Sequence, residues 1–199
     1  LGALTVGHNH PHVVEAVCRQ MRDGAIFSLP HWLESHVAER LCAVIPCAEQ
    51  VKFVKTGSEA TSGAVRIVRA ASGRVPIVTL HGNYNGWHDW TAVRADKHPG
   101  VPEFMRHGVV EVETVTDLLL LSRNSLTAAI IVEPERVEQA QSGALKKLMA
   151  GKDHGVVVIF DEMLSGGRLR VGGAQEFYGV TPDLATFGER RLRFATALG

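Results

Sequence analysis

The chain has 199 residues, 45% of them hydrophobic, which suffices for one sizeable core. Its 21 Lys and Arg residues balance 21 Asp and Glu residues, so no excess of positive charge indicates nucleic acid or an anionic membrane as a partner. The sequence shows no secretory signal pattern and no apolar run of membrane-spanning length. Cys18, Cys42 and Cys47 lack the spacing of a zinc site or a disulfide framework and are expected to be small core residues of a reduced, cytoplasmic protein.

Three histidines at alternate positions, His8, His10 and His12, precede an amphipathic helix predicted over residues 13–21. Alternation in an irregular segment rarely brings three rings together, and no carboxylate stands beside them, so we predict no metal ion here. A metal hydrolase built on these histidines is kept as a third alternative. A second amphipathic helix is predicted over residues 33–45.

A short strand over residues 51–54 leads through a Thr-Gly-Ser turn into a helix that is predicted to end at Gly73. Free backbone N–H groups, hydroxyl groups and the positive end of the helix dipole make such a turn suitable for a phosphate group. The turn lacks the length and the lysine of a P-loop, so a nucleoside triphosphate is not expected. Ser58 acting only as the N-cap of the helix explains the same residues.

A strand over residues 76–80 is followed by a Gly-rich loop, residues 81–90, that contains Tyr84 and Trp87. Exposed loop aromatics need a surface to pack on, and either a flat ligand ring or a subunit interface supplies one. Residues 94–107 are predicted to form a polar surface excursion. A weak strand over residues 109–112 and a helix over residues 115–121 follow.

Two apolar runs end in carboxylates: residues 127–132 lead into Glu133, and residues 156–160 lead into Asp161 and Glu162. Such runs are typical of strands buried on both faces in a parallel sheet, and ligands bind beyond the carboxyl ends of these strands. A carboxylate at that place needs a partner or a ligand. Asp161 acting as the cap of a following helix is an equal alternative.

Residues 135–142 are predicted to be a polar loop, residues 143–149 a helix and residues 184–187 a final strand, with no obvious terminal element after it. The alternation of strands and helices predicts an α/β fold of three layers, with a mainly parallel sheet and helices on both faces.

Six short motifs stand in a distinctive order. They are Gly-His-x-His-Pro (7–11), Thr-Gly-Ser-Glu-Ala (56–60), Tyr84 in its Gly loop, Glu133-Pro134, Phe-Asp-Glu-x-x-x-Gly-x-Arg (160–168) and Pro-Asp-Leu-x-x-x-Gly (182–188). In this order they resemble the class III pyridoxal-phosphate-dependent aminotransferases, closest to the glutamate-1-semialdehyde 2,1-aminomutase-like branch, over essentially the whole chain. The resemblance implies that residues 1–199 form a partial large domain of the fold type I enzymes that bind pyridoxal phosphate. The N-terminal segment and the small C-terminal domain are expected to be absent.

The resemblance also implies the cofactor, pyridoxal 5′-phosphate, and the residues that bind it. Gly57 and Ser58 match the phosphate-binding turn, and Tyr84 matches the aromatic residue that stacks on the ring. Glu133 matches the strand-end glutamate that shapes the pocket, and Asp161 matches the carboxylate that keeps the pyridine nitrogen protonated. Met163 matches the residue on the opposite ring face, which is usually a valine. The implied partners are a small-molecule amino donor, a carbonyl acceptor and a second copy of the chain in a homodimer. No nucleic acid and no membrane are expected.

One departure concerns the reaction itself. The family places Gly-Lys after the Pro-Asp-Leu strand, and that lysine bonds to the cofactor aldehyde, whereas this chain has Glu189 there. A carboxylate can move a proton but cannot hold an aldehyde covalently, so no catalytic residue is assigned with certainty. The prediction is an aminotransferase or aminomutase, the latter an isomerase, that is weak or inactive. The alternative is a non-catalytic pseudoenzyme or gene remnant that acts as a binding or dimerisation partner.

Overall fold

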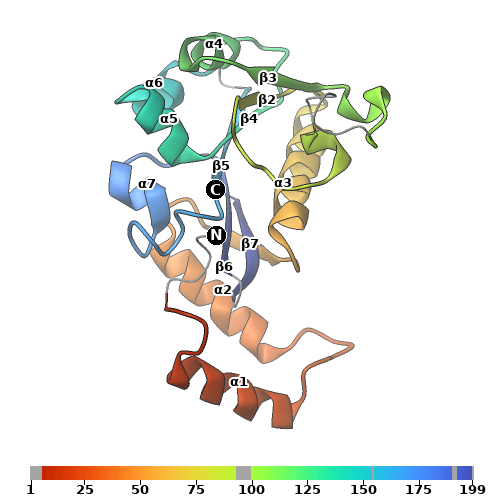
Figure 1. Ribbon diagram of the computed structural model, residues 1–199, viewed down its shortest axis with the longest axis vertical. Coiled ribbons are helices and arrows are strands. Elements are labelled where there is room, and N and C mark those ends of the chain that lie inside the picture. The colour runs from red at the N-terminus through yellow and green to blue at the C-terminus, as the bar shows by residue number, and fades with distance from the viewer. Residues whose placement is uncertain (1–5, 93–99, 154, 190–191, 199) are drawn as a thin grey trace.

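The computed structural model describes residues 6–92, 100–153, 155–189 and 192–198, and Figure 1 shows their arrangement. The helices are α1 (Pro11–Asp23), α2 (Trp32–Val44), α3 (Gly57–Ser72), α4 (Val115–Leu121), α5 (Pro134–Ala140), α6 (Ala144–Gly151) and α7 (Gly173–Tyr178). The strands are β1 (Gln50–Phe53), β2 (Ile77–Leu80), β3 (Val109–Val112), β4 (Ala129–Val132), β5 (Val157–Glu162), β6 (Leu184–Glu189) and β7 (Leu192–Leu198). Two short 3₁₀ helices, η1 (Asp89–Thr91) and η3 (Glu103–Arg106), lie between β2 and β3.

The strands form one sheet in the order β1-β7-β6-β5-β4-β2-β3. The pairs from β3 through β2, β4 and β5 to β6 are all parallel, whereas β7 is antiparallel to both β6 and β1. Parallel neighbours need crossover connections, which the helices supply. The predicted α/β fold with a mainly parallel sheet is therefore confirmed.

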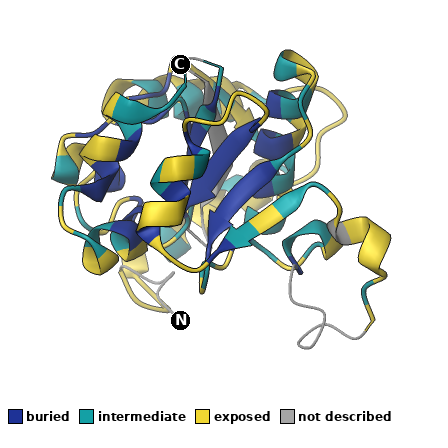
Figure 2. Ribbon diagram, turned by 90° about the horizontal axis from the view of Figure 1, so that it is seen from above, coloured by how far each residue is buried: buried dark blue, intermediate teal, exposed yellow. Residues whose placement is uncertain are grey.

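The pleat of the sheet sends alternate side chains into two separate cores. One core joins Val78, Ile130, Val158 and Phe160 to Leu118 of α4, Val137 of α5 and Leu145 of α6. The other joins Ile77, Ile131, Ile159 and Leu184 to Ala64, Val65 and Val68 of α3. Figure 2 shows the buried strands between the partly exposed helices. Helices therefore cover both faces, as the three-layer prediction requires.

Three elements differ from the expectations. The stretch expected to be a polar loop contains α5, which Pro134 begins and which buries Val137. The Gly-rich segment after Arg168 contains α7, and β7 follows the strand that was expected to be the last. Both missed helices have fewer than eight residues, so neither spans enough turns to show a clear helical period. Of the polar excursion predicted over residues 94–107, residues 94–99 lie outside the described residues.

The N-terminal arm, residues 6–32, reaches away from the sheet, while α2 packs against β1 (Figure 1). The arm contains α1, in which no residue is buried. All three cysteines are free, but only Cys47 is a buried core residue; Cys18 is exposed, contrary to the expectation, because the apolar face of α1 lies off the body. Within the described residues, no helix combines the length and the apolar character that crossing a bilayer requires.

Candidate functional site

The loop of residues 81–90 connects the carboxyl ends of three strands with the start of α3. The backbone N–H of Tyr84 donates to Glu133 Oε1 at 2.7 Å, beyond the end of β4. Asn85 Nδ2 donates to Asp161 Oδ2 at 2.8 Å, at the end of β5. The backbone N–H of Trp87 donates to the Ser58 hydroxyl oxygen at 3.1 Å, in the first turn of α3. Residues 84–87 therefore connect the groups at the edge of the sheet where ligands are expected.

Asp161 lies on the same face of the sheet as α3, is only 2% exposed, and is held by side chains on both sides. Thr186 of β6 donates to Oδ1 at 3.0 Å, while Asn85 occupies Oδ2. Thr79 donates to Asn85 Oδ1 at 3.0 Å, which turns the Asn85 amide group toward the carboxylate. The alternative of Asp161 as a helix cap is wrong, because the residue ends a strand and the next helix begins at Gly173.

Burial, with a smaller contribution from the nearby Glu133 carboxylate, raises the pKa of Asp161 to about 6, against the hydrogen bonds from Asn85 and Thr186, which lower it. The carboxyl group therefore remains mostly ionised at pH 7. It is a buried negative charge whose direct partners are neutral, which suits a cationic group of a ligand.

Glu162 points to the opposite face and has a structural role. Its Oε2 accepts from the Ser165 hydroxyl at 3.0 Å and from the backbone N–H of Ala174, and its Oε1 accepts from Gln175 Nε2 at 2.9 Å. Gln175 Oε1 in turn accepts from the backbone N–H of Cys47 at 2.9 Å. Glu162 thus connects β5 to α7 and to the segment after α2, and burial raises its pKa to about 7.

Glu162 should make stability dependent on pH. In the folded chain its pKa is raised from 4.5 to about 7, so the folded state retains a proton that the unfolded state has lost. The free energy of unfolding is therefore expected to fall as pH rises through this window. Asp161 adds a smaller fall between 3.8 and about 6.

Urea unfolding at a series of pH values measures this slope. Glu162→Gln should be less stable at every pH and should show a clearly shallower fall, whereas the exposed Glu39→Gln should retain the wild-type slope. A Glu162→Gln variant with the full slope would show that the titrating group lies elsewhere.

The first turn of α3 is capped by Thr56, whose hydroxyl accepts from the backbone N–H of Glu59 at 3.2 Å in a capping box. Ser58 is therefore not the N-cap, and that alternative is wrong. In the part of the chain that the structure describes, the backbone N–H groups of Gly57 and Ser58 donate no hydrogen bond. The Ser58 hydroxyl accepts from Trp87 and retains its own hydrogen for a further acceptor.

Two close approaches place this turn beside Asp161. A Cβ on Gly86, where φ is +108°, would lie 2.7 Å from the Ser58 hydroxyl oxygen, so the loop backbone lies against the first turn of α3 at this residue. Gly86 is the next residue after Asn85, which contacts Asp161. A Cβ on Gly57 would lie 2.9 Å from Met163 Cε, so Met163 packs against the same turn. Asp161 and Ser58 are thus on the same side of the molecule, and two consecutive loop residues, Asn85 and Gly86, lie against them.

Two aromatic side chains of the loop, Tyr84 and Trp87, are open to solvent. Tyr84 is 67% exposed and Trp87 82% exposed, which leaves room for a ligand ring or for another chain against them. Glu133 is buried, and its Oε2 also accepts from Arg136 Nε at 2.5 Å. Tyr84 is therefore fixed through its backbone while its ring stays free.

Sequence reasoning missed Asn85, Thr186, Thr79 and Arg136. Thr79 and Thr186 are polar residues in the middle of otherwise apolar strands, and that feature could have indicated a buried polar partner. Asn85 and Arg136 carried no comparable signal, because their partners are fixed only by the tertiary fold.

The other candidates lie away from this site or contribute little to it. Among the described residues, the three metal-type ligands that converge are His81, Glu111 and Glu113, whereas the histidines at 8, 10 and 12 are exposed and do not converge. Arg168 Nε donates to the Leu164 carbonyl at 3.1 Å, which is a local contact. Glu189 ends β6 in the backbone, and its side chain lies outside the described part of the structure.

The family model for class III aminotransferases matches residues 1–192. The chain belongs to the class III aminotransferase family. The predicted resemblance is therefore confirmed at the level of the family.

Relatives of this class III chain include a curated glutamate-1-semialdehyde 2,1-aminomutase of Methanothermobacter thermautotrophicus, 38% identical over 94% of this chain and 49% of the relative. The fold is similar to that of an omega-transaminase from Sphaerobacter thermophilus, with a TM-score of 0.83, 30% identity and coverage of 100% of this chain and 51% of that one. A transaminase solved with PLP bound gives a TM-score of 0.85 and 28% identity, over 100% of this chain and 51% of that one. The chain thus spans about half the length of these relatives, 49% to 51%. The family and the PLP-bound neighbour support pyridoxal phosphate as the cofactor.

Proposed function

We propose that this chain is part of a pyridoxal-phosphate-dependent aminotransferase or aminomutase, which moves an amino group from a donor to an aldehyde or ketone, or within one molecule. The observation that carries the proposal is the buried, ionised Asp161 on the same side as the unengaged N–H groups of Gly57 and Ser58. A cofactor with a pyridine ring at one end and a phosphate at the other needs an anion and a phosphate-binding turn on one side of the molecule.

Asp161 would accept a hydrogen bond from the protonated pyridine nitrogen, because its two side-chain donors leave lone pairs available. The phosphate would bind the N–H groups of Gly57 and Ser58 and the Ser58 hydroxyl, assisted by the dipole of α3. When bound, the protonated ring supplies electron withdrawal from the substrate carbon. The protein's part is to hold the charge at the nitrogen and to fix the phosphate.

Tyr84 and Met163 would cover the two faces of the ring. The exposed Tyr84 ring has space to stack, and the flexible Met163 thioether lies against Gly57, where it can follow the ring surface. Glu133 shapes the pocket by fixing the Tyr84 backbone.

We infer weak or no transaminase activity from Glu189, which stands at the family's lysine position. A carboxylate has no amine with which to hold the cofactor aldehyde. A non-catalytic binding or dimerisation partner is therefore the second candidate.

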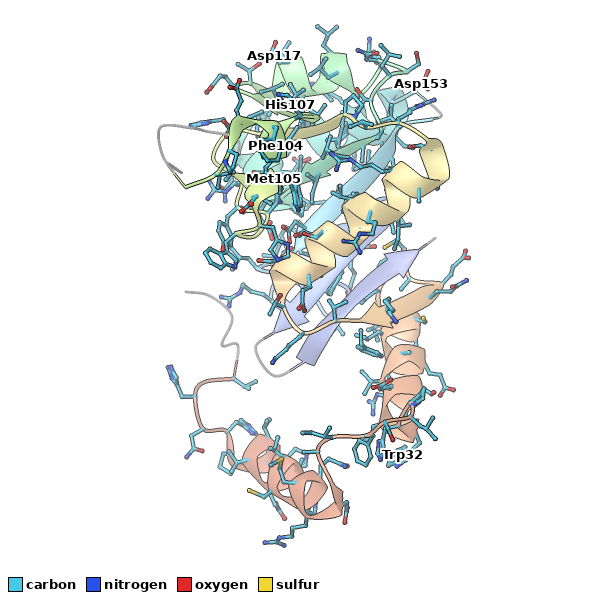
Figure 3. All side chains as sticks on the ribbon, turned by 90° about the vertical axis from the view of Figure 1, so that its right-hand side faces the viewer. Trp32, Phe104, Met105, His107, Asp117 and Asp153 are labelled. Carbon is cyan, nitrogen blue, oxygen red and sulfur yellow. The ribbon has the colours of Figure 1, made fainter. Side chains whose placement is uncertain are left out.

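The N-terminal arm favours a homodimer. It exposes Met21, Ile26 at 95%, Leu29 at 78% and Trp32 at 65%. Figure 3 labels Trp32, at the start of α2 and away from the sheet. Apolar side chains gathered on one projecting segment are typical of a protein–protein contact. Size-exclusion chromatography with light scattering measures the oligomeric state, and a monomer would contradict this part. The cytoplasmic location stays a prediction.

Pyridoxamine 5′-phosphate tests the site without the missing lysine, because it has an amine in place of the aldehyde. Calorimetric titration of the whole chain should show one molecule bound per chain. Pyridoxamine without the phosphate should bind at least about tenfold more weakly, because the contacts with the first turn of α3 are lost. A folded chain that binds neither would contradict the proposed cofactor site.

A further inference from the structure

We propose that Arg136 is a positioning residue of the cofactor site. It holds the Glu133 carboxylate in place, and Glu133 in turn fixes the backbone of Tyr84. The inference rests on the proposed function, in which the Tyr84 ring covers one face of the cofactor.

Hydrogen bonds connect α5 to the loop of residues 81–90 through Glu133. Glu133 follows β4, and its side chain is 9% exposed, whereas that of Arg136 is 50% exposed. Glu133 Oε2 accepts from Arg136 Nε at 2.5 Å, and Oε1 accepts from the Tyr84 backbone N–H at 2.7 Å. Each oxygen of Glu133 thus accepts from a different partner, one on α5 and one in the loop of residues 81–90.

A nearly buried carboxylate that loses its cationic partner turns toward water to replace the lost hydrogen bond. This movement weakens Glu133 as the acceptor for Tyr84. Arg136 also lies beside the start of the loop, since a Cβ on Gly82 would lie 3.4 Å from Arg136 Nη1. One guanidinium group thus lies next to Gly82 and acts on Tyr84 through Glu133.

Titration with pyridoxamine 5′-phosphate measures the effect on the site. Arg136→Gln should weaken binding about tenfold, as expected for a lost charge-assisted hydrogen bond, and Arg136→Lys, which retains the charge, should recover part of the affinity. The exposed Arg40→Gln on α2 has the same change of charge and should bind like the wild type. In a Tyr84→Ala background, Arg136→Gln should have little further effect, because the ring it positions is gone.

Amide hydrogen exchange tests the contact without any ligand. In Arg136→Gln the segment 82–86 should exchange about tenfold faster than in the wild type and in Arg40→Gln. Unchanged exchange would overturn the proposal, and so would a full Arg136→Gln effect on binding in the Tyr84→Ala background. If the wild type binds no pyridoxamine 5′-phosphate, the proposed function fails, and exchange alone then decides whether Arg136 fixes the loop.

Discussion

Replacement of Asp161 by Asn is expected to weaken the binding of pyridoxamine 5′-phosphate by roughly 10- to 100-fold, the usual effect of losing a hydrogen bond to a charged group. The wild-type carboxylate is 2% exposed and ionised, so it attracts a protonated ring nitrogen in a medium that screens charge poorly. Asn retains the shape but not the charge, and its amide group faces the Asn85 and Thr186 donors. Calorimetric titration gives the dissociation constant.

The matched control is Asp23→Asn, an exposed residue on α1, which should bind like the wild type. A urea-unfolding curve for each variant establishes that the titrated protein is folded. A folded Asp161→Asn variant with wild-type affinity would show that the ring nitrogen lies elsewhere, even if the phosphate is held as proposed.

Replacement of Glu189 by Lys is expected to restore a covalent bond between the chain and the aldehyde of pyridoxal phosphate. Glu189 ends β6, and in the parallel pair Asp161 lies opposite Thr186, so residue 189 continues toward the same edge of the sheet. At 3.3 Å per residue it lies about 10 Å further along the strand, and the register shift between Phe187 and Glu189 interrupts the alternation of faces there. We expect the long lysine side chain and the cofactor together to cover this span. A new near-visible absorption band would report the bond.

Borohydride reduction followed by peptide mapping identifies the bonded residue. The Glu189→Lys variant should carry the cofactor mass on residue 189, whereas the wild type and Glu189→Gln should show no stable adduct within the site. A stable wild-type adduct on another lysine of the pocket would contradict the inferred loss of activity. A Glu189→Lys variant that binds the cofactor without the adduct would show that position 189 is not the place of the family's lysine.

The sequence alone could predict the main parts of the site because parallel strands end at one edge. Each of three residues, Gly57, Glu133 and Asp161, follows or ends a stretch that the sequence predicts to be a strand. The structure places the ends of these strands at one edge of the sheet. The N-cap of α3 could also be predicted from the sequence, since Thr56 and Glu59 have the spacing of a capping box. The alternative considered above was Ser58.

The partners of the carboxylates could not be predicted in the same way. Asn85 reaches Asp161 only because the loop folds back over two strands, and Thr186 does so through the register of β5 and β6. Neither relation leaves a periodic pattern in the sequence. The short helix α5 was missed for a related reason, since a single buried Val137 gives no repeat, and Arg136 was missed with it.

Asp161 and Glu162 are neighbours with different environments, because each successive residue of a strand faces the opposite side of the sheet. Asp161 faces the α3 side, where we propose that the cofactor binds, and Glu162 anchors α7 on the opposite side. Deletion or insertion of a single residue early in β5 would exchange these two duties. The number of residues in β5 before Asp161 is therefore as important as their identity. Variant libraries meant to alter the chemistry of the protein should change side chains here and keep the number of residues constant.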